Sequence, residues 1–339
     1  MRNRTGSLST ATKVAGLLVS ITAGVAACGT DTVPAGVHVA PRAGAAGTGV
    51  ADAGEWGPRS ALASSRTVPG EAEAHRRLRA LEASFKGRIG AYALDTATGR
   101  TVAYRSGERF PLLSTFKTLA AAAVLHRART SDPGLMDRVV RWKRSDLKPN
   151  SPITEKHVDD GLTVARLCEA AITRSDNTAA NMLLKQIGGP AGLTAYVRTL
   201  KDPVSRLDRW ETDLNRWSPK ERRDTTTPAS MARDLRALTF GDALAAEDRA
   251  RLDGWLRANK TGDGRIRAGL PKTWIIGDKT GTATAYGAAN DVAVIRTSES
   301  APPLIMAVYT TRLAADAPGD EKVIADTAAV LARALGRLP

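Results

Sequence analysis

Residues 88–104 read RIGAYALDTATGRTVAY, and the fold can be worked out from this segment in both directions. Two short apolar stretches, Arg88 to Leu94 and Thr101 to Tyr104, flank a polar sequence that contains Gly99. Apolar stretches on either side of a polar, glycine-containing turn are typical of a β-hairpin. The segment therefore predicts two antiparallel strands.

Helical periodicity surrounds this hairpin. On its N-terminal side, residues 71–85 (EAEAHRRLRALEASF) place Leu78, Leu81 and Phe85 on one face, which predicts an amphipathic helix. On its C-terminal side, segments with the same periodicity are separated by Gly, Pro, Asp and Asn. These segments run from Thr115 to Arg127, Val164 to Ala170, Thr178 to Ile187, Gly192 to Leu200, Pro228 to Leu238 and Ala246 to Ala258.

Strand patterns return near the C-terminus, from Thr273 to Gly277, Asp291 to Thr297 and Pro303 to Thr311, before a helix from Glu321 to Leu335. We expect early and late strands to share one sheet. The prediction is an α/β fold in which an antiparallel sheet is flanked by N- and C-terminal helices. This discontinuous α/β domain covers residues 71–112 and 258–339, and residues 113–257 form an inserted all-helical domain. The active site is expected in the cleft between them.

The chain is strongly basic, with 49 Lys and Arg against 35 Asp and Glu and a net charge of +14. Such a balance can indicate a nucleic-acid partner. The basic residues are however interspersed with acidic ones, as in residues 137–148 and 249–257, and no nucleic-acid-binding motif accompanies them. A solvated cationic surface is the better interpretation, so no nucleic-acid partner is expected.

The N-terminus has the features of an export signal. Arg2, Arg4 and Lys13 are followed by the apolar residues 14–27, too few for a comfortable transmembrane helix. Residues 1–27 are therefore predicted to be a signal peptide. Its end, VAAC, resembles the lipobox of bacterial lipoproteins, in which Cys28 would become the lipid anchor. In the alternative, cleavage occurs at a nearby small-residue site and Cys28 has no role.

Residues 28–70 are rich in Gly, Ala, Pro, Ser and Thr and show no sustained periodicity. Such a composition buries too little apolar area to offset the entropy of ordering, so a flexible linker is predicted. The protein is expected outside the cytoplasm, either lipid-anchored to the outer face of the cytoplasmic membrane or secreted. The second cysteine, Cys168, lies in an apolar stretch and is expected to be a buried, inert thiol.

The first candidate catalytic motif is Ser114-Thr-Phe-Lys117, which lies one residue before the apolar run LAAAAVL. Ser114 is therefore predicted near a helix N-terminus, with Lys117 one turn along the same face. A serine hydroxyl is a poor nucleophile unless a base lies within reach, and such a lysine can supply one. Taken alone, the pattern fits an N-cap serine and a surface lysine better.

Three further motifs follow in order. Ser175-Asp176-Asn177 lies in a helical region, Glu211 and Asn215 lie in the segment RWETDLN, and Lys279-Thr280-Gly281-Thr282 continues a strand pattern. Together, S-x-x-K, S-D-N and K-T-G resemble the motif set of class A β-lactamases and penicillin-binding proteins. The E-x-x-L-N pattern from Glu211 to Asn215 is similar to the omega loop of class A enzymes. Penicillin-binding peptidases generally lack this glutamate.

The resemblance extends from Glu71 to the C-terminus and implies a serine β-lactamase that acts on penicillins and cephalosporins. In that reading Ser114 forms an acyl-enzyme, and the backbone N–H groups of Ser114 and Thr282 form the oxyanion hole. Lys117, or Glu211 through a water molecule, takes the serine proton, and the choice between them stays open.

The remaining motif residues receive roles from the same resemblance. Ser175 passes a proton to the lactam nitrogen, and Glu211 with Asn215 positions the deacylating water. Asn177 contacts the substrate's amide side chain, while Lys279, Thr280 and Thr282 face its carboxylate. An arginine is also expected at this carboxylate because its donors form a fixed fork. The family has two positions for it, of which one holds Ala289 here, so the role falls to Arg265.

The sequence departs from the family pattern in places. Thr212 stands where many members have proline after the glutamate, and Asn150 stands where an aromatic residue commonly flanks the cleft. Leu113 and Ala283 occupy positions at which certain carbapenem-hydrolysing members place two cysteines, so that disulfide cannot form. Arg209 and Asp224 match a pair that joins the two ends of the omega loop.

The sequence lacks the motifs of metal-binding and nucleotide-binding enzymes. The histidines, at positions 38, 75, 126 and 157, are scattered and match no metal-ligand spacing, and Lys279-Thr280 lacks the glycines of a P-loop. No metal or cofactor is expected, and the protein is expected to be a monomer. Two alternatives remain: a D-alanyl-D-alanine peptidase with slow deacylation, and a non-catalytic lipoprotein that binds β-lactams or cell-wall peptides.

Overall fold

A computed structural model of the chain describes residues 70–339, which belong to one compact unit. The predicted signal peptide, Cys28 and almost all of the predicted linker lie outside the described residues. The predicted boundaries between an α/β domain and a helical domain, at residues 112/113 and 257/258, stay predictions.

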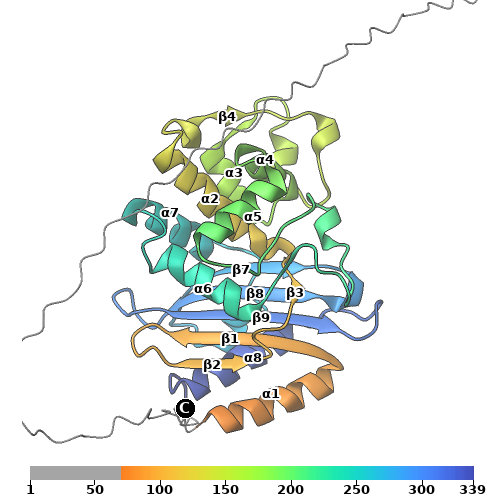
Figure 1. Cartoon of the computed structure of the whole chain (residues 1–339), viewed down its shortest axis with the longest axis vertical. Helices are drawn as coiled ribbons and strands as arrows, with labels where there is room; N and C mark the ends of the chain where they lie inside the picture. The colour runs from red at the N-terminus through yellow and green to blue at the C-terminus, as the bar shows by residue number, and fades with distance from the viewer. Residues whose placement is uncertain (1–69) are drawn as a thin grey trace, which may run out of the picture. The chain divides into compact units, whose positions relative to one another are not determined.

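The centre of the molecule is a five-stranded antiparallel sheet with the strand order β2-β1-β9-β8-β7 (Figure 1). The predicted hairpin forms β1 (Gly87–Asp95) and β2 (Thr101–Tyr104). The late strands are β7 (Ile275–Thr282), β8 (Ala289–Arg296) and β9 (Leu304–Arg312). Because β1 pairs with β9 along its whole length, the two ends of the chain share one sheet, as predicted.

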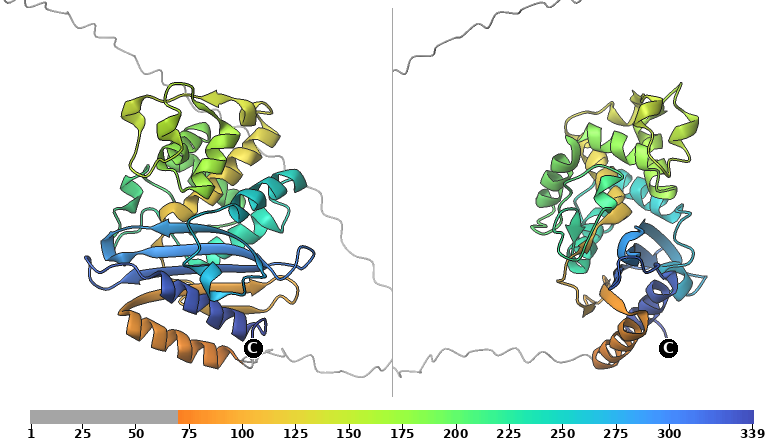
Figure 2. Two further views of the ribbon diagram at one scale, coloured as in Figure 1. Left: turned by 180° about the vertical axis from the view of Figure 1, so that it is seen from behind. Right: turned by 90° about the vertical axis from the view of Figure 1, so that its right-hand side faces the viewer.

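Helices α1 (Glu71–Phe85) and α8 (Glu321–Ala334) lie together on one face of this sheet (Figure 2). The period-two alternation of the strands explains how both faces are covered. In β9, Leu304, Met306 and Val308 pack into the core under α1 and α8, and Ile305, Ala307 and Tyr309 pack into the core on the other side. The sheet is therefore buried on both faces.

The other helices lie on the opposite face (Figure 1). They are α2 (Phe116–Thr130), α3 (Val164–Thr173), α4 (Asn177–Gln186), α5 (Gly189–Thr199), α6 (Pro228–Thr239) and α7 (Ala246–Arg257). Helix α6 packs on β1, β8 and β9, and α7 packs on β7. Residues 116–125 of α2 are buried all round, which the small side chains of its alanine run permit. Helix α2 is thus the central helix of this layer.

Short elements connect the sheet with the helices. Two strand pairs were not predicted, namely β3 (Phe110–Pro111) with β6 (Thr225–Thr226) and β4 (Val139–Val140) with β5 (Leu162–Thr163). The 3₁₀-helices are η1 (Leu113–Thr115), η2 (Leu135–Asp137), η3 (Arg144–Asp146), η4 (Thr154–Lys156), η5 (Asp213–Asn215), η6 (Ile266–Gly269) and η7 (Ala285–Gly287). The β3–β6 pair holds the chain where it leaves the sheet, immediately before η1.

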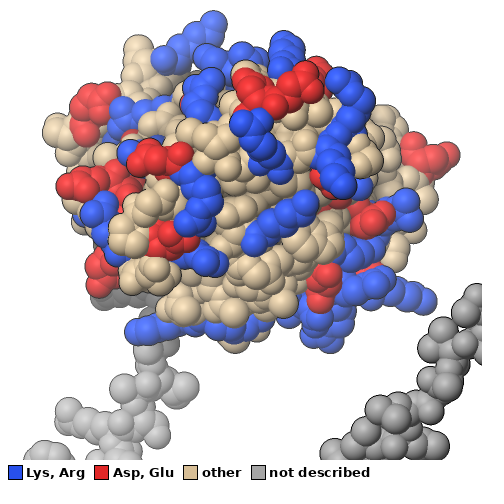
Figure 3. Space-filling model, turned by 90° about the horizontal axis from the view of Figure 1, so that it is seen from above, with Lys and Arg blue, Asp and Glu red and all other residues tan. Residues whose placement is uncertain are grey.

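Charges of both signs are interspersed on the face seen in Figure 3, which agrees with the mixed charge pattern of the sequence. None of the helices within residues 70–339 combines the length and the apolar character that a membrane span requires.

Candidate active site

Ser114 lies in η1, directly before α2 begins at Phe116. Its side chain is almost fully buried, and the preceding Leu113 has a positive φ of 47°, a conformation unusual for a branched side chain. Strand β7 approaches closely here, because a Cβ added to Gly281 would lie 2.9 Å from the Leu113 Cβ and 3.2 Å from the Ser114 nitrogen. The glycine of the K-T-G motif therefore permits the close packing of β7 against the segment that carries Ser114.

Lys117 is fully buried in the first turn of α2. Its ammonium group donates to the Ser175 carbonyl oxygen at 2.7 Å and to Asn177 Oδ1 at 2.6 Å, and it lies 3.1 Å from Glu211 Oε1. Burial lowers the pKa of Lys117 below its ordinary value, although the Glu211 carboxylate opposes this shift. A lysine with a lowered pKa is neutral in a larger fraction of molecules near pH 7, and only the neutral amine can accept a proton.

Ser175 links this lysine to a second one. It has a positive φ of 55°, and its hydroxyl accepts a hydrogen bond from Lys279 Nζ at 3.1 Å. Lys279 is fully buried in β7 and also donates to the Thr280 carbonyl at 2.8 Å. Burial, followed by the charge of Lys117, brings the pKa of Lys279 well below its ordinary value. Two buried lysines thus converge on one serine.

Asp176 holds the Ser175 turn in place. Its carboxylate caps helix α4 through the Ala179 N–H and accepts three more hydrogen bonds from the backbone of Ile153 and from Thr154. Because these donors come from another loop, Asp176 joins the loop of residues 151–157 to the S-D-N turn. Its function is therefore to position Ser175 and Asn177.

Glu211 and Asn215 lie together in the loop that ends in η5. Asn215 Nδ2 donates to Glu211 Oε2 at 2.8 Å. Two oxygens nearby, Glu211 Oε1 and Asn215 Oδ1, are buried and have no hydrogen-bond donor among the described residues, although the Lys117 ammonium lies 3.1 Å from the first. Buried oxygens of this kind are suited to a water molecule.

The backbone at Glu211 is fixed from helix α4. Asn181 donates to the Glu211 carbonyl at 2.9 Å and accepts from the Glu211 N–H at 3.0 Å. The peptide bond between Glu211 and Thr212 is cis, although Thr212 is not proline. Thr212, which stands where many family members have proline, therefore follows a cis peptide bond.

The ends of the same loop are joined by a network around Asp224. Arg209 Nε donates to Asp224 Oδ2 at 2.5 Å, and Asp224 Oδ1 accepts from the backbone N–H groups of Asp208 and Arg209. In turn, the Asp224 N–H donates to Asp208 Oδ2 at 3.0 Å. The predicted contact of Arg209 with Asp224 is therefore confirmed.

Sequence and structure comparisons agree with this arrangement. A model described as the β-lactamase enzyme family matches residues 73–335. The chain belongs to the class A β-lactamase family. It is 52% identical over 256 residues to β-lactamase FAR-1 of Nocardia farcinica. The matched region covers 76% of this chain and 81% of that relative.

Solved structures extend the comparison. A β-lactamase from Streptosporangium roseum is 76% identical with a TM-score of 0.78 and covers 79% of this chain and 100% of its own. An ancestral class A β-lactamase is 52% identical with a TM-score of 0.73 and covers 77% of this chain and 99% of its own. The chain is therefore a serine β-lactamase, and the predicted fold class is confirmed.

In this β-lactamase, Arg265 lies beside the end of β7 and is almost fully buried. It donates to the hydroxyl of Thr282 at 2.7 Å, to the carbonyl oxygens of Gly281 and Asn290, and to Glu321. Four of its five N–H donors are thus used within the protein, and one on Nη2 is left. Arg265 therefore orients Thr282 and keeps one N–H without a partner among the described residues.

Thr280 and Asn177 complete the set of predicted residues. The Thr280 hydroxyl is 2.6 Å from that of Thr261, a residue that the sequence did not single out. Asn177 donates to the Pro149 carbonyl at 2.7 Å, and its backbone N–H donates to Asn150. The predicted catalytic and substrate-binding residues therefore lie on η1, α2, η5 and β7, at the first position of α4, and in the turns beside these elements and η6.

The supporting roles of several residues were not predicted from the sequence. Asp176, Asn181 and Thr261 have clear roles in the structure, and Asn150 Nδ2 donates to the Ser175 carbonyl at 3.2 Å. Asn150 is therefore a support of the S-D-N turn, in a place where the sequence suggested only the loss of an aromatic wall. Asp176 could have been found as an N-cap signal before α4.

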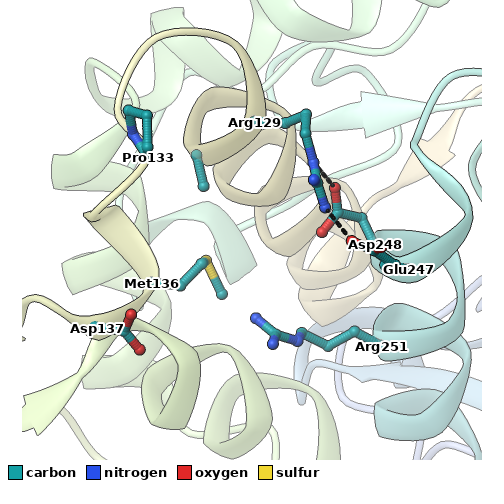
Figure 4. Close-up of a pocket in the computed structure, with 8 residues that line it drawn as sticks. Arg129, Pro133, Met136, Asp137, Glu247, Asp248 and Arg251 are labelled. Carbon is teal, nitrogen blue, oxygen red and sulfur yellow. Dashed lines mark hydrogen bonds and ion pairs between the residues drawn. The ribbon is translucent and has the colours of Figure 1, made fainter.

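A separate pocket of about 330 Å³ lies at the other end of α2, between Met136, Arg129 and residues of α7 (Figure 4). Because Arg129 is 15 residues beyond Ser114, the pocket is about 20 Å away along the helix axis. The pocket is therefore not part of the catalytic site. Within residues 70–339, no cluster of His, Cys, Asp and Glu is placed to hold a metal ion.

Proposed function

We propose that this β-lactamase hydrolyses penicillins and cephalosporins through an acyl-enzyme on Ser114, which is deacylated by a water molecule held by Glu211 and Asn215. The observation that carries the proposal is a pair of buried oxygens, Glu211 Oε1, which has the Lys117 ammonium at 3.1 Å, and Asn215 Oδ1, which has no donor among the described residues. A water molecule bound there would donate to both and lie beside the Lys117 ammonium.

Acylation begins with removal of the Ser114 proton. Lys117 is fully buried with a lowered pKa, and it lies 3.1 Å from Glu211, so that a proton can pass between the two side chains. We assign both residues to this step. The developing oxyanion is placed between the backbone N–H groups of Ser114 and Thr282, which the close approach of β7 to Ser114 supports.

Ring opening requires a proton for the lactam nitrogen. The Ser175 hydroxyl accepts from Lys279 and lies 3.4 Å from Lys117 Nζ. Ser175 can therefore donate its own proton to the nitrogen and regain one from either lysine. This is the basis for the relay role of Ser175.

Substrate binding is assigned to the end of β7. Lys279, Thr280 and Thr282, with the remaining donor of Arg265, supply positive charge and hydroxyl groups for the β-lactam carboxylate. Asn177 has a second N–H on Nδ2 for the substrate's amide carbonyl.

We further propose that the protein acts as a monomer outside the cytoplasm, held at the membrane through Cys28 or secreted. The support is the N-terminal sequence, in which basic residues, an apolar run of suitable length and VAAC follow one another.

Hydrolysis by the purified full chain tests the proposal directly. We expect turnover of benzylpenicillin and of a chromogenic cephalosporin by the wild type and no turnover by Ser114→Ala, with no release of D-alanine from a D-alanyl-D-alanine peptide. Stoichiometric binding of penicillin without turnover, together with D-alanine release, would instead indicate a peptidase.

A further inference from the structure

A second pocket of about 290 Å³ lies along α3, beside Ile153 and the residues that follow α7. Its lining includes four charged side chains, those of Arg166, Glu169, Arg174 and Lys260. Arg166 donates to Glu169 at 2.7 Å, so these two charges offset each other. Arg174 and Lys260 are exposed, and their side chains form no hydrogen bond or ion pair with any described residue. The pocket therefore carries two uncompensated positive charges.

Two residues that line this pocket are sequence neighbours of residues at the catalytic site. Arg174 directly precedes Ser175, and Lys260 directly precedes Thr261, whose hydroxyl is 2.6 Å from that of Thr280. The Lys260 N–H donates to the Thr173 carbonyl at 3.0 Å, which ties the two cationic segments to each other. The segments that carry Arg174 and Lys260 thus lie next to each other and lead directly into Ser175 and Thr261.

The chemistry of a cephalosporin connects the two places. Its ring carboxylate is on C4, and the variable substituent is on the adjacent carbon, C3, at the end of the fused ring remote from the lactam carbonyl. With the lactam carbonyl at Ser114 and the carboxylate at Thr280 and Thr282, the C3 substituent projects from the carboxylate end of the ligand, which is the end beside Thr261 and its neighbour Lys260. A volume of about 290 Å³ accommodates a group such as a short alkyl sulfonate.

We propose that the pocket bounded by Arg174 and Lys260 is a subsite for anionic C3 substituents of cephalosporins. The inference rests on the proposed function of the neighbouring site. The subsite favours a sulfonate or carboxylate at C3 over a neutral group and disfavours a cationic one.

The test uses three cephalosporins with the same acylamino side chain and a sulfonatopropylthiomethyl, an acetoxymethyl or a pyridiniummethyl group at C3. kcat/KM is measured for the full-length wild type, Arg174→Gln and Lys260→Gln, with Arg251→Gln as the matched control. Arg251 lines the separate pocket of Figure 4, so its replacement removes the same charge far from Ser114. The acetoxymethyl compound also reports whether each variant is folded and active.

We expect the ratio of kcat/KM for the sulfonate to that for the acetoxymethyl compound to fall about two- to fivefold for each charge removed, mainly through KM. The ratio of kcat/KM for the pyridinium compound to that for the acetoxymethyl compound should rise. Added salt should weaken both effects. Arg251→Gln should leave the ratios unchanged.

Two results would overturn the proposal in distinguishable ways. If the wild type hydrolyses the acetoxymethyl compound and the ratios are the same in all four proteins, the pocket is not a subsite, whereas the proposed function stands. If the wild type hydrolyses none of the three compounds, the proposed function is wrong and the subsite falls with it.

Discussion

At the scale of single residues, Asp234 on α6 is a strongly perturbed carboxyl group outside the catalytic site. Burial, followed by the neighbouring Asp202 carboxylate, raises the pKa of Asp234 to about 9. Asp234 is therefore protonated at neutral pH and can donate its proton to Asp202, whose own pKa is lowered in part by this hydrogen bond.

This arrangement predicts a pH dependence of stability. Because the folded pKa of Asp234 lies above its unfolded value, the folded state keeps a proton that the unfolded state loses, so this contribution weakens as pH rises toward 9. Asp234→Asn keeps a donor toward Asp202 but does not titrate. Its stability relative to wild type should rise by up to about 1.4 kcal/mol per pH unit between pH 5 and 8.

Urea unfolding at several pH values measures this difference. The exposed Glu247→Gln, which removes a carboxylate from the surface helix α7, should show no such trend. A difference between Asp234→Asn and wild type that stays constant with pH would contradict the shared proton.

Arg265 gives a second prediction at this scale. Since it orients Thr282 and has one free donor, Arg265→Ala should raise KM for benzylpenicillin about tenfold or more, the size expected for hydrogen bonds to a charged group. Arg265→Ala combined with Thr282→Ala should be less damaging than the two single effects added together, because both act on one carboxylate. Full additivity would exclude the joint role, and an unchanged KM in Arg265→Ala would exclude any contact with substrate.

At the scale of elements, the loop from Arg209 to Asp224 carries Glu211, the residue to which deacylation is assigned in the proposed function. Its ends are joined by the Arg209–Asp224 pair, and Asp224 is fully buried. Arg209→Ala should lower the free energy of unfolding by about 1.5–3 kcal/mol, since a charged hydrogen-bond partner of a buried carboxylate is lost. Deacylation should slow more than acylation, because Glu211 lies in this loop.

Urea unfolding and single-turnover kinetics check both parts of that prediction. Arg216→Ala on the same loop is the control, because the Arg216 side chain is 82% exposed and its ion pair with Asp213 is on the surface. If Arg209→Ala slows acylation and deacylation equally, the loop does not act specifically on the water step.

The regular elements were largely predictable, since periodicity alone places helices and strands. Predicted α1, residues 71–85, matches the observed bounds, α6 and α7 differ by one residue at one end, and α4 is shifted by one residue at both ends. The strand predicted at residues 273–277 is instead Ile275–Thr282. Buried Asp278 and Lys279 break its apolar pattern, and they are stabilised by Arg267, Asn259 and Ser175 from elsewhere in the chain.

The candidate site was predictable only where a motif marked it. Asn181 and Thr261 act through partners that are 30 and 19 residues away in sequence, and no local pattern signals such contacts. The two-residue strands β3 and β6 could not be predicted from the sequence either, because a pair this short depends on tertiary packing.

At the scale of the whole molecule, residues 70–339 contain both cores and every predicted catalytic side chain. A fragment of these residues should therefore hydrolyse benzylpenicillin with the same kcat as the full chain. A fragment that is folded but tenfold less active would show that the N-terminal segment contributes to the site.

The N-terminal segment is proposed to determine location only. Cys28→Ser should release active enzyme from the membrane fraction of a bacterial host, whereas the wild type should carry a lipid detectable by mass spectrometry. Cys168→Ser is the control, because that thiol is buried in α3 with its pKa raised by burial. Equal release of wild type and Cys28→Ser would contradict the anchor.

The central claim is that Glu211 turns an acylated serine into a hydrolase, and intact-mass measurement of the acyl-enzyme tests it most directly. Wild type and Glu211→Gln are each mixed with excess benzylpenicillin and sampled over time. We predict free enzyme at the end for the wild type, and for Glu211→Gln a persistent adduct on Ser114 with deacylation slowed by about 10²–10⁴-fold. A persistent adduct in both proteins, or rapid turnover by Glu211→Gln, would contradict the account.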